Sequence, residues 1–397
     1  MERWKKNLYI LWGAGFILMA AVSSIMPFLP LHIEQNMGIE SEKDISMWSG
    51  LIFGVNFFTA FLIAPLWGKI ADKNGRKIMI LRSGIGMALV TILMGFATNV
   101  YQLFALRFLN GLVVGFNPAS IALIAMNTPK EKTGYALGLL SSGAVAGTII
   151  GPLYGGILAE YITYNQIFIF TGILILIAAL IVLFFVKEDF TPRKNISRSM
   201  SEDFKKIIYT KPLFAVFSIS FLIQFAIMSI NPILSLFVIE LNPPGLKISF
   251  FAGLIAATTG ITNVLSSPRL GKLGDRYGPE KILFYSMIGA TLLFIPQGFS
   301  SNVWQLMFWR FLLGFALGGL LPSVNSIIKK FAPEGMESIT YSYSSSAIFL
   351  GNLMGPIIGG ILVGYIGFNG VFLIVSVLLA LNSILIKKLL IDRPDRN

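Results

Sequence analysis

The 397-residue chain has no cysteine and a single histidine, His32, so disulfides and thiolate metal sites are excluded and a histidine-based zinc site is not expected. Charge is also scarce: 13% of the residues are Asp, Glu, Lys or Arg, against about a quarter in a soluble domain. The Walker sequence Gly-x-x-x-x-Gly-Lys-Ser/Thr is missing, so ATP is not the direct energy source. We therefore predict neither an enzyme nor a bound metal or cofactor.

Hydrophobic residues make up 55% of the chain and are gathered in runs long enough to cross a bilayer. Such runs must satisfy their own backbone hydrogen bonds, which favours helices. The sequence predicts an all-α membrane protein with twelve transmembrane helices, near residues 8–33, 46–67, 78–97, 100–126, 134–160, 165–186, 212–240, 248–268, 280–299, 303–328, 340–365 and 369–390.

The net charge of +12 does not indicate nucleic-acid binding, because the basic residues are spread over short loops between apolar runs. Alternate loops and the two termini hold 27 Lys and Arg residues, including Arg82 in the second–third loop, whereas the intervening loops hold 2. By the positive-inside rule both termini lie in the cytoplasm. We expect a multi-pass protein of the bacterial inner membrane that is monomeric.

The two halves of the chain are copies. The stretch 99–116 recurs at 302–319 with nine of eighteen residues identical, and the loop at 68–77 recurs at 271–280 with the same shift of 203. Six spans per repeat give both halves the same topology, as in transporters that rock around a central cavity. We predict two pseudo-symmetric six-helix bundles around such a cavity, comprising residues 1–186 and 212–397 and joined by a cytoplasmic linker, 187–211.

The repeated loop is the first candidate for gating. Gly68 and Gly75 allow a tight turn, while Asp72 is able to sit at a helix end or to pair with a base such as Arg76. The pattern favours a cytoplasmic latch that is held in one conformation and broken in another. The alternative is a plain turn with basic anchors. The second copy keeps Asp275 but has Pro and Glu where the first has Arg and Lys, which predicts a weaker latch.

Two arginines lie inside apolar runs at equivalent positions, Arg107 and Arg310. An arginine within the membrane indicates function, unless it snorkels to the headgroups. Glu34 ends the first span and Glu240 the seventh, so we expect Glu34 to approach Arg107 and Glu240 to approach Arg310, with protonation coupled to transport. Equally, both glutamates could be ordinary interfacial charges.

Small residues four apart, Gly147 and Gly151, precede Pro152 in the fifth span and allow close packing and a kink. No acidic residue lies in the middle of an apolar run, which favours lipophilic solutes. Polar residues within the runs are candidates for lining the cavity: Asn56, Asn117, Gln224, Asn231, Asn263, Asn325, Tyr341 and Tyr343.

These motifs resemble those of the major facilitator superfamily, specifically its twelve-helix drug–proton antiporters, and most closely the MdtG-like multidrug efflux permeases. The loop from Gly68 resembles the first signature of that family, Arg107 with Gly111 the second, and 147–156 the antiporter signature; Pro27-Phe28-Leu29-Pro30 is similar to the proline pattern of its first helix. The resemblance implies gating by Asp72 and Arg76, proton coupling by Arg107, and a helix kink at Gly151 and Pro152. It also implies proton-driven export of small lipophilic compounds by alternating access.

Other functions remain open. A proton–solute symporter or a carrier of one metabolite would have the same fold, but a symporter would not need the signature of the fifth span. Several drug antiporters carry an acidic residue deep in the membrane, and this chain does not, which favours neutral or zwitterionic substrates over cations.

Overall fold

A computed structural model describes residues 2–25, 29–39, 42–190, 200–241 and 248–392. Within these residues every regular element is a helix. The helices are α1 (Arg3–Ile25), α2 (Leu29–Met37), α3 (Glu42–Asn74), α4 (Arg76–Met94), α5 (Val100–Val113), α6 (Phe116–Asn127), η2 (Lys130–Lys132), α7 (Thr133–Tyr161), α8 (Tyr164–Phe185), α9 (Met200–Ile208), α10 (Lys211–Glu240), α11 (Ile248–Tyr277), α12 (Pro279–Gly298), α13 (Val303–Leu317), α14 (Leu320–Phe331), α15 (Glu337–Ile386) and η3 (Lys387–Ile391).

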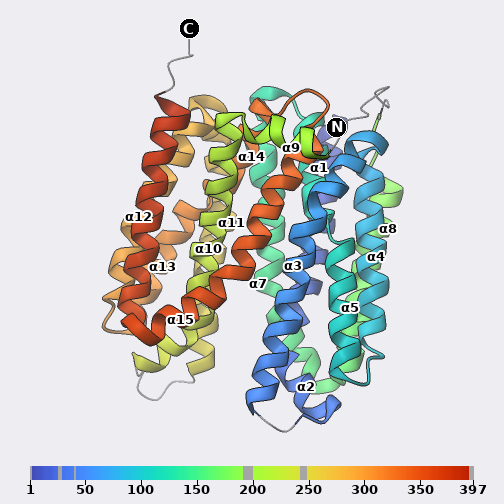
Figure 1. Cartoon of the computed structure of the whole chain (residues 1–397), viewed down its shortest axis with the longest axis vertical. Helices are drawn as coiled ribbons and strands as arrows, with labels where there is room; N and C mark the ends of the chain where they lie inside the picture. Colours follow the sequence, from blue (N-terminus) through green and yellow to red (C-terminus); the bar gives the residue numbers. More distant parts are fainter. Residues whose placement is uncertain (1, 26–28, 40–41, 191–199, 242–247, 393–397) are drawn as a thin grey trace. The chain divides into compact units, whose positions relative to one another are not determined.

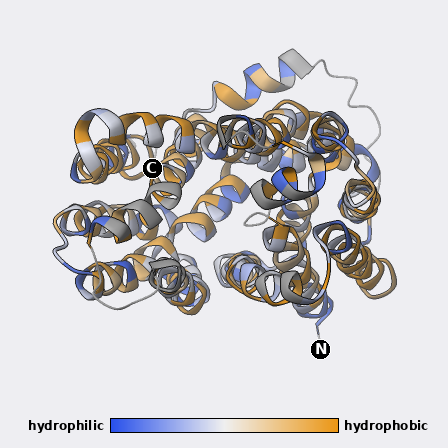
Figure 2. Ribbon diagram, turned by 90° about the horizontal axis from the view of Figure 1, so that it is seen from below, coloured by the Kyte–Doolittle hydropathy of each residue, from blue (hydrophilic) through white to orange (hydrophobic). Residues whose placement is uncertain are grey.

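Ten helical stretches of the described residues are long and apolar enough to cross a membrane. The last of them, Glu337–Ile391, is long enough for two spans, because α15 bends at Gly367, where φ is 68° and ψ is 178°. With α11 at the eighth predicted span, the helices account for the twelve spans predicted. Hydrophobic residues, shown in orange in Figure 2, occur along these helices.

The chain forms two compact units, each of which takes a short segment from the opposite half of the sequence. Unit 1 comprises Met1–Asn127, Gly143–Ile196 and Gly335–Ser346, and unit 2 comprises Thr128–Ser142, Ser197–Glu334 and Ala347–Asn397. The first turns of α7 therefore belong to unit 2, and the first turns of α15 to unit 1. The division into bundles at 1–186 and 212–397 stays a prediction.

In unit 1 the helices run side by side, as Figure 1 shows for α3, α4, α5 and α8. Small residues permit the close contact of α4 with α8. A Cβ atom on Gly84 would lie 2.8 Å from the Cβ of Ala179, and one on Gly172 would lie 2.8 Å from the carbonyl oxygen of Ala88. Larger side chains at these positions would force the two helices apart.

Equivalent glycines hold the second and fourth spans of each repeat together. A Cβ on Gly111 of α5 would collide with the Thr59 hydroxyl of α3, and one on Gly314 of α13 would collide with the Thr262 hydroxyl of α11. The internal repeat of the sequence thus reappears as the same helix contact in both units.

Three predicted spans differ from the structure. The run 100–126 is split into α5 and α6, and the run 303–328 into α13 and α14. In the first, Pro118 has no N–H to donate to the Val114 carbonyl four residues earlier, and Gly115 adopts a φ of 148°. The first run, 8–33, is covered by α1 and the separate helix α2, while Pro27 lies outside the described residues.

Candidate functional site

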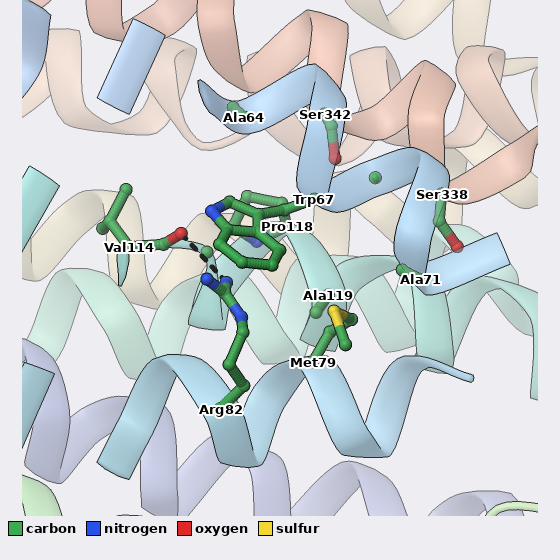
Figure 3. A pocket seen from close by; sticks show the side chains of 12 residues that line it. Ala64, Trp67, Ala71, Met79, Arg82, Val114, Pro118, Ala119, Ser338 and Ser342 are labelled. Carbon is green, nitrogen blue, oxygen red and sulfur yellow. Dashed lines mark hydrogen bonds between the residues drawn. The ribbon is translucent and has the colours of Figure 1, made fainter. Parts of the chain in front are cut away.

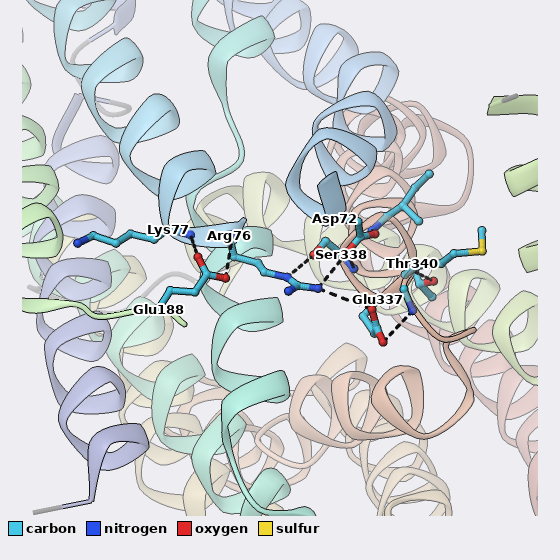
Figure 4. A network of polar contacts seen from close by, with 10 residues as sticks. Asp72, Arg76, Lys77, Glu188, Glu337, Ser338 and Thr340 are labelled. Carbon is cyan, nitrogen blue, oxygen red and sulfur yellow. Dashed lines mark hydrogen bonds and ion pairs between the residues drawn. The ribbon is translucent and has the colours of Figure 1, made fainter. Parts of the chain in front are cut away.

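Asp72, in the last turn of α3, caps the N-terminus of α15 (Figure 4). Its Oδ1 accepts the amide N–H of Ser338 at 2.8 Å, and its Oδ2 accepts that of Ile339 at 2.9 Å. A carboxylate at this place satisfies two of the free N–H groups of the helix and lies at the positive end of its dipole. The contact joins the repeated loop to the predicted eleventh span.

Arg76 completes this site, which we call the first latch. Its Nη2 donates to Asp72 Oδ1 at 3.1 Å and lies 3.6 Å from Glu337 Oε2, while its Nε donates to the Ser338 hydroxyl at 2.9 Å. The side chains of Asp72, Arg76 and Glu337 are largely buried, with exposed fractions of 6%, 13% and 10%. Charge-assisted hydrogen bonds between buried groups are among the stronger ones in proteins.

The two glycines of the first latch have separate roles. A Cβ on Gly68 would lie 2.7 Å from the Ile339 Cα, so only glycine lets α3 approach α15 this closely. Gly75 has a φ of 97° and precedes α4 without a side-chain cap of its own. Glu188 supplies that cap, because its carboxylate accepts the amides of Arg76 at 3.0 Å and Lys77 at 2.7 Å.

A second latch repeats the geometry in unit 2. Asp275, in the last turn of α11, accepts the amide N–H groups of Gly134 at 2.6 Å and Tyr135 at 2.9 Å, in the first turn of α7. A Cβ on Gly271 would collide with the Gly134 carbonyl, just as a Cβ on Gly68 would collide with the Ile339 backbone. Burial raises the pKa of the Asp275 carboxyl, and the hydrogen bonds from Tyr135 and Gly134 oppose that rise.

The charges around the second latch differ from those of the first. Lys329 of α14 donates to the Thr128 carbonyl at 2.8 Å and to the Thr133 hydroxyl at 2.7 Å. Glu280, which stands where the first copy has Lys77, is buried and pairs with Lys330 at 2.6 Å. The two backbone hydrogen bonds of the cap are nevertheless the same in both copies.

The glycines of the fifth span pack against α1. A Cβ on Gly147 would lie 2.8 Å from the Ala20 amide nitrogen, and one on Gly151 would collide with Ser23. Pro152 lies inside α7. In unit 2 the equivalent Gly355 packs in the same way, because a Cβ on it would lie 2.8 Å from the Met228 Cβ of α10.

Arg107 and Arg310 are both buried, each with an exposed fraction of 4%, and the Nε and Nη2 of each have no hydrogen-bond partner. Glu34 and Glu240 are exposed. In the part of the chain that the structure describes, no ion pair joins Glu34 to Arg107 or Glu240 to Arg310. The structure therefore does not bring these predicted partners together, and their role in proton coupling stays a prediction.

The candidates for lining the cavity are divided between the units. Unit 1 holds Asn56, Asn117, Tyr341 and Tyr343, and unit 2 holds Gln224, Asn263 and Asn325. Tyr341 is fully buried, Asn325 is nearly so, and the Asn117 amide donates to Met19 Sδ at 3.4 Å. The side chain of Asn231 lies outside the described residues. A common cavity stays a prediction.

A stacked pair that the sequence did not reveal holds the break between α5 and α6 (Figure 3). The Arg82 guanidinium lies 3.5 Å from the centre of the Trp67 ring. Trp67 Nε1 donates to the Leu112 carbonyl at 2.7 Å, and Arg82 Nη2 donates to the Val114 carbonyl at 3.3 Å. Arg82 thus supplies the donor that Pro118 lacks. It lies within α4 and not in the loop to which the charge count assigned it.

The buried polar groups among the described residues include no cluster suited to a metal ion. Among the described residues no cluster of three His, Asp or Glu side chains is placed to hold an ion. The Arg82 Nε and Nη1 are buried without hydrogen-bond partners, and Arg82 lines a cavity of about 20 Å³ together with Ser338 and Ser342 of α15. Such a cavity has room for about one water molecule.

Comparison with known proteins gives a consistent result. The chain matches the family described as Major Facilitator Superfamily over residues 11–252 and 216–397. It is 42% identical over 382 residues to the multidrug resistance protein MdtG of Salmonella typhimurium, covering 96% of this chain and 94% of that protein, and the same figures hold for MdtG of Citrobacter koseri. The crystal structure of the human organic anion transporter MFSD10 has the same fold, with a TM-score of 0.85, 17% identity, and coverage of 97% and 100%.

Proposed function

The chain belongs to the Major Facilitator Superfamily, and on that basis we propose that it exports small lipophilic compounds by alternating access, driven by the entry of protons. It is a multi-pass membrane transporter, and its relatives named for multidrug resistance are 42% identical over almost the whole chain. Their name gives the substrate class that we propose. The same proposal places the protein in the inner membrane of a bacterium, with both termini in the cytoplasm. It also takes a single chain as the working unit.

The pair of helix caps is the observation that carries the proposal. Asp72 and Asp275 each hold the first turn of a helix that begins in one unit and continues in the other. Each cap consists of two hydrogen bonds to backbone amides and is about 1–2 kcal/mol strong by analogy with other helix caps. A contact of that strength is able to break and re-form during a transport cycle, as alternating access requires.

Flexibility within unit 1 supports the same mechanism. Gly147 and Gly151 let α7 pack directly on α1, and Pro152 removes one backbone hydrogen bond of α7. We propose that these residues allow α7 to bend when its first turn leaves Asp275.

Proton coupling rests on the buried arginines. A guanidinium within the membrane costs several kcal/mol, and Arg107 and Arg310 keep buried N–H groups without partners. We propose that a carboxylate, with Glu34 and Glu240 as the candidates, pairs with them in another state of the cycle and gives up its proton there. Asn56, Asn117, Gln224, Asn231, Asn263, Asn325, Tyr341 and Tyr343 remain the candidates for substrate contact.

The test is transport into inverted membrane vesicles that are energised by respiration, using a fluorescent lipophilic dye. Proton-driven export predicts that wild-type vesicles take up the dye and release it when an uncoupler is added, and that Arg107→Ala vesicles do neither. Dye uptake that survives the uncoupler would contradict proton coupling. A proton–solute symporter or a narrow carrier is the second candidate, and it predicts no uptake of the dye in this vesicle orientation.

A further inference from the structure

An open groove lies in unit 2 between α11, α12 and α13. It has a volume of about 380 Å³ and is lined by Ser266, Arg269 and Leu270 of α11, Tyr285 and Ser286 of α12, and Phe315 and Ala316 of α13. Its volume is within the range of small-molecule pockets, of roughly 300–1,000 Å³. Apart from Arg269 and the two serines, the residues that line the groove are apolar or aromatic.

The lining of the groove differs from the equivalent positions of unit 1, and two of the differences replace the stacked pair. Leu270 stands at the position of Trp67, and Tyr285 at the position of Arg82, each shifted by 203. In unit 1 the Arg82 guanidinium stacks 3.5 Å from the centre of the Trp67 ring. In unit 2 the leucine is smaller than the indole and Tyr285 is 66% exposed, and both residues line the open groove.

The groove carries positive charge that forms no ion pair with the described residues of unit 2. Arg269 is exposed, and its one hydrogen bond is a long one, 3.5 Å, from its own Nη1 to the Leu265 carbonyl. Lys281 is exposed one turn before Tyr285 on α12. No acidic side chain of the described residues pairs with either cation, since Asp275 accepts two backbone amides and Glu280 pairs with Lys330.

We propose that this groove binds an anionic phospholipid of the surrounding bilayer. The phosphodiester would contact Arg269, with Lys281 adding to the positive potential, and an acyl chain would lie against Leu270, Phe315 and Ala316. The match is one of chemistry: a basic residue at an apolar groove between membrane helices selects an amphiphile with a negative headgroup. The predicted topology places this end of α11 on the cytoplasmic side, where anionic lipids attract basic residues.

The test is lipid binding by the purified full-length protein, measured by native mass spectrometry with graded additions of phosphatidylglycerol or phosphatidylethanolamine. Arg269→Gln should weaken phosphatidylglycerol binding about five-fold, the loss that corresponds to about 1 kcal/mol for one basic residue near anionic lipid. Leu270→Trp should also reduce binding, because Leu270 lines the groove and an indole takes up more of its space. Arg269 is exposed, so its replacement leaves folding unaffected.

Two matched variants serve as controls. Lys73→Gln removes an exposed positive charge from α3 in unit 1, and Leu381→Trp adds an indole to an exposed position of α15; neither residue lines the groove. Both should bind phosphatidylglycerol as the wild type does. Equal binding of the two lipids, or the same loss in the controls as in Arg269→Gln and Leu270→Trp, would overturn the proposal. The measurement involves no transport, so its failure would leave the proposed export untouched.

Discussion

The Asp72 carboxylate accepts the amide N–H of Ser338 at 2.8 Å, although 266 residues separate the two in the chain. Asp72 ends one helix of the first repeat, and Ser338 begins a helix of the second. Arg76 holds both groups, because it donates to the Asp72 carboxylate and to the Ser338 hydroxyl. The first signature loop is therefore a helix cap supported by an ion pair.

Removing this cap should expose the first turn of α15. In Asp72→Ala the Ser338 and Ile339 amides lose their acceptor, at a cost of about 1–2 kcal/mol typical of helix caps. We expect hydrogen–deuterium exchange of a peptide covering these amides to become roughly ten-fold faster, the change that corresponds to about 1.4 kcal/mol.

The second latch provides the control for that experiment. Exchange at Gly134 and Tyr135 should stay as in the wild type in Asp72→Ala, and should accelerate in Asp275→Ala. If Asp72→Ala left the α15 peptide as protected as before, the helix cap would not hold this helix in solution.

Close packing of α7 on α1 predicts a strong effect of one methyl group. In Gly151→Ala the new Cβ collides with Ser23, and overpacking of this kind costs about 1–3 kcal/mol. We expect a lower unfolding temperature and slower transport. Gly13→Ala is the matched variant, because a Cβ there meets nothing within 4 Å, and it should behave as the wild type or be slightly more stable. Equal effects of the two substitutions would contradict the packing argument.

The break between α5 and α6 should depend on the Trp67 indole. Trp67→Phe keeps an aromatic ring under Arg82 but leaves the Leu112 carbonyl without its donor, at a cost of about 1–3 kcal/mol. Thermal unfolding should report this loss. Trp309→Phe provides the comparison, since the Trp309 Nε1 is buried without a partner, and removing it should cost no hydrogen bond. A Trp67→Phe protein as stable as the wild type would rule out the proposed role.

The second latch should respond to pH in the direction set by burial. Because burial raises the pKa of Asp275, the capped state binds a proton more tightly than a solvated carboxylate does. The resulting stabilisation of the cap is full below the ordinary pKa of aspartate and is lost as the pH rises through the raised value. After correction for intrinsic rates, the Gly134 and Tyr135 amides should be better protected in acid, and Asp275→Asn should abolish this dependence. Protection that falls on acidification would contradict it.

Periodicity and repetition were sufficient to predict the helical fold and to single out Asp72 and Asp275, while their role in gating stays a prediction. The shift of 203 made Asp275 the counterpart of Asp72, and both proved to be helix caps. Their partners were not predictable, because a backbone amide is present at every residue other than proline and carries no sequence signature. Pro118, by contrast, was a visible signal for the break in the fourth predicted span.

Charges near span boundaries were harder to assign. Counting Arg82 with the loop hid its stacking on Trp67, because an arginine six residues into a helix looks the same in sequence as one at its end. Spacing also suggested that Glu34 meets Arg107, but Glu34 is exposed and Arg107 is buried. Sequence separation from a membrane edge does not determine which side of a helix a residue faces.

Proton antiport is tested most directly by the sign of the proton movement that a substrate gradient drives. The purified protein would be reconstituted in liposomes that contain a pH-sensitive dye, and a lipophilic substrate would be added outside, with protein-free liposomes and the Arg107→Ala protein as controls. Antiport predicts that the interior becomes more alkaline as the substrate enters, and that neither control responds. An interior that becomes more acidic as the substrate enters would show symport and contradict the export mechanism.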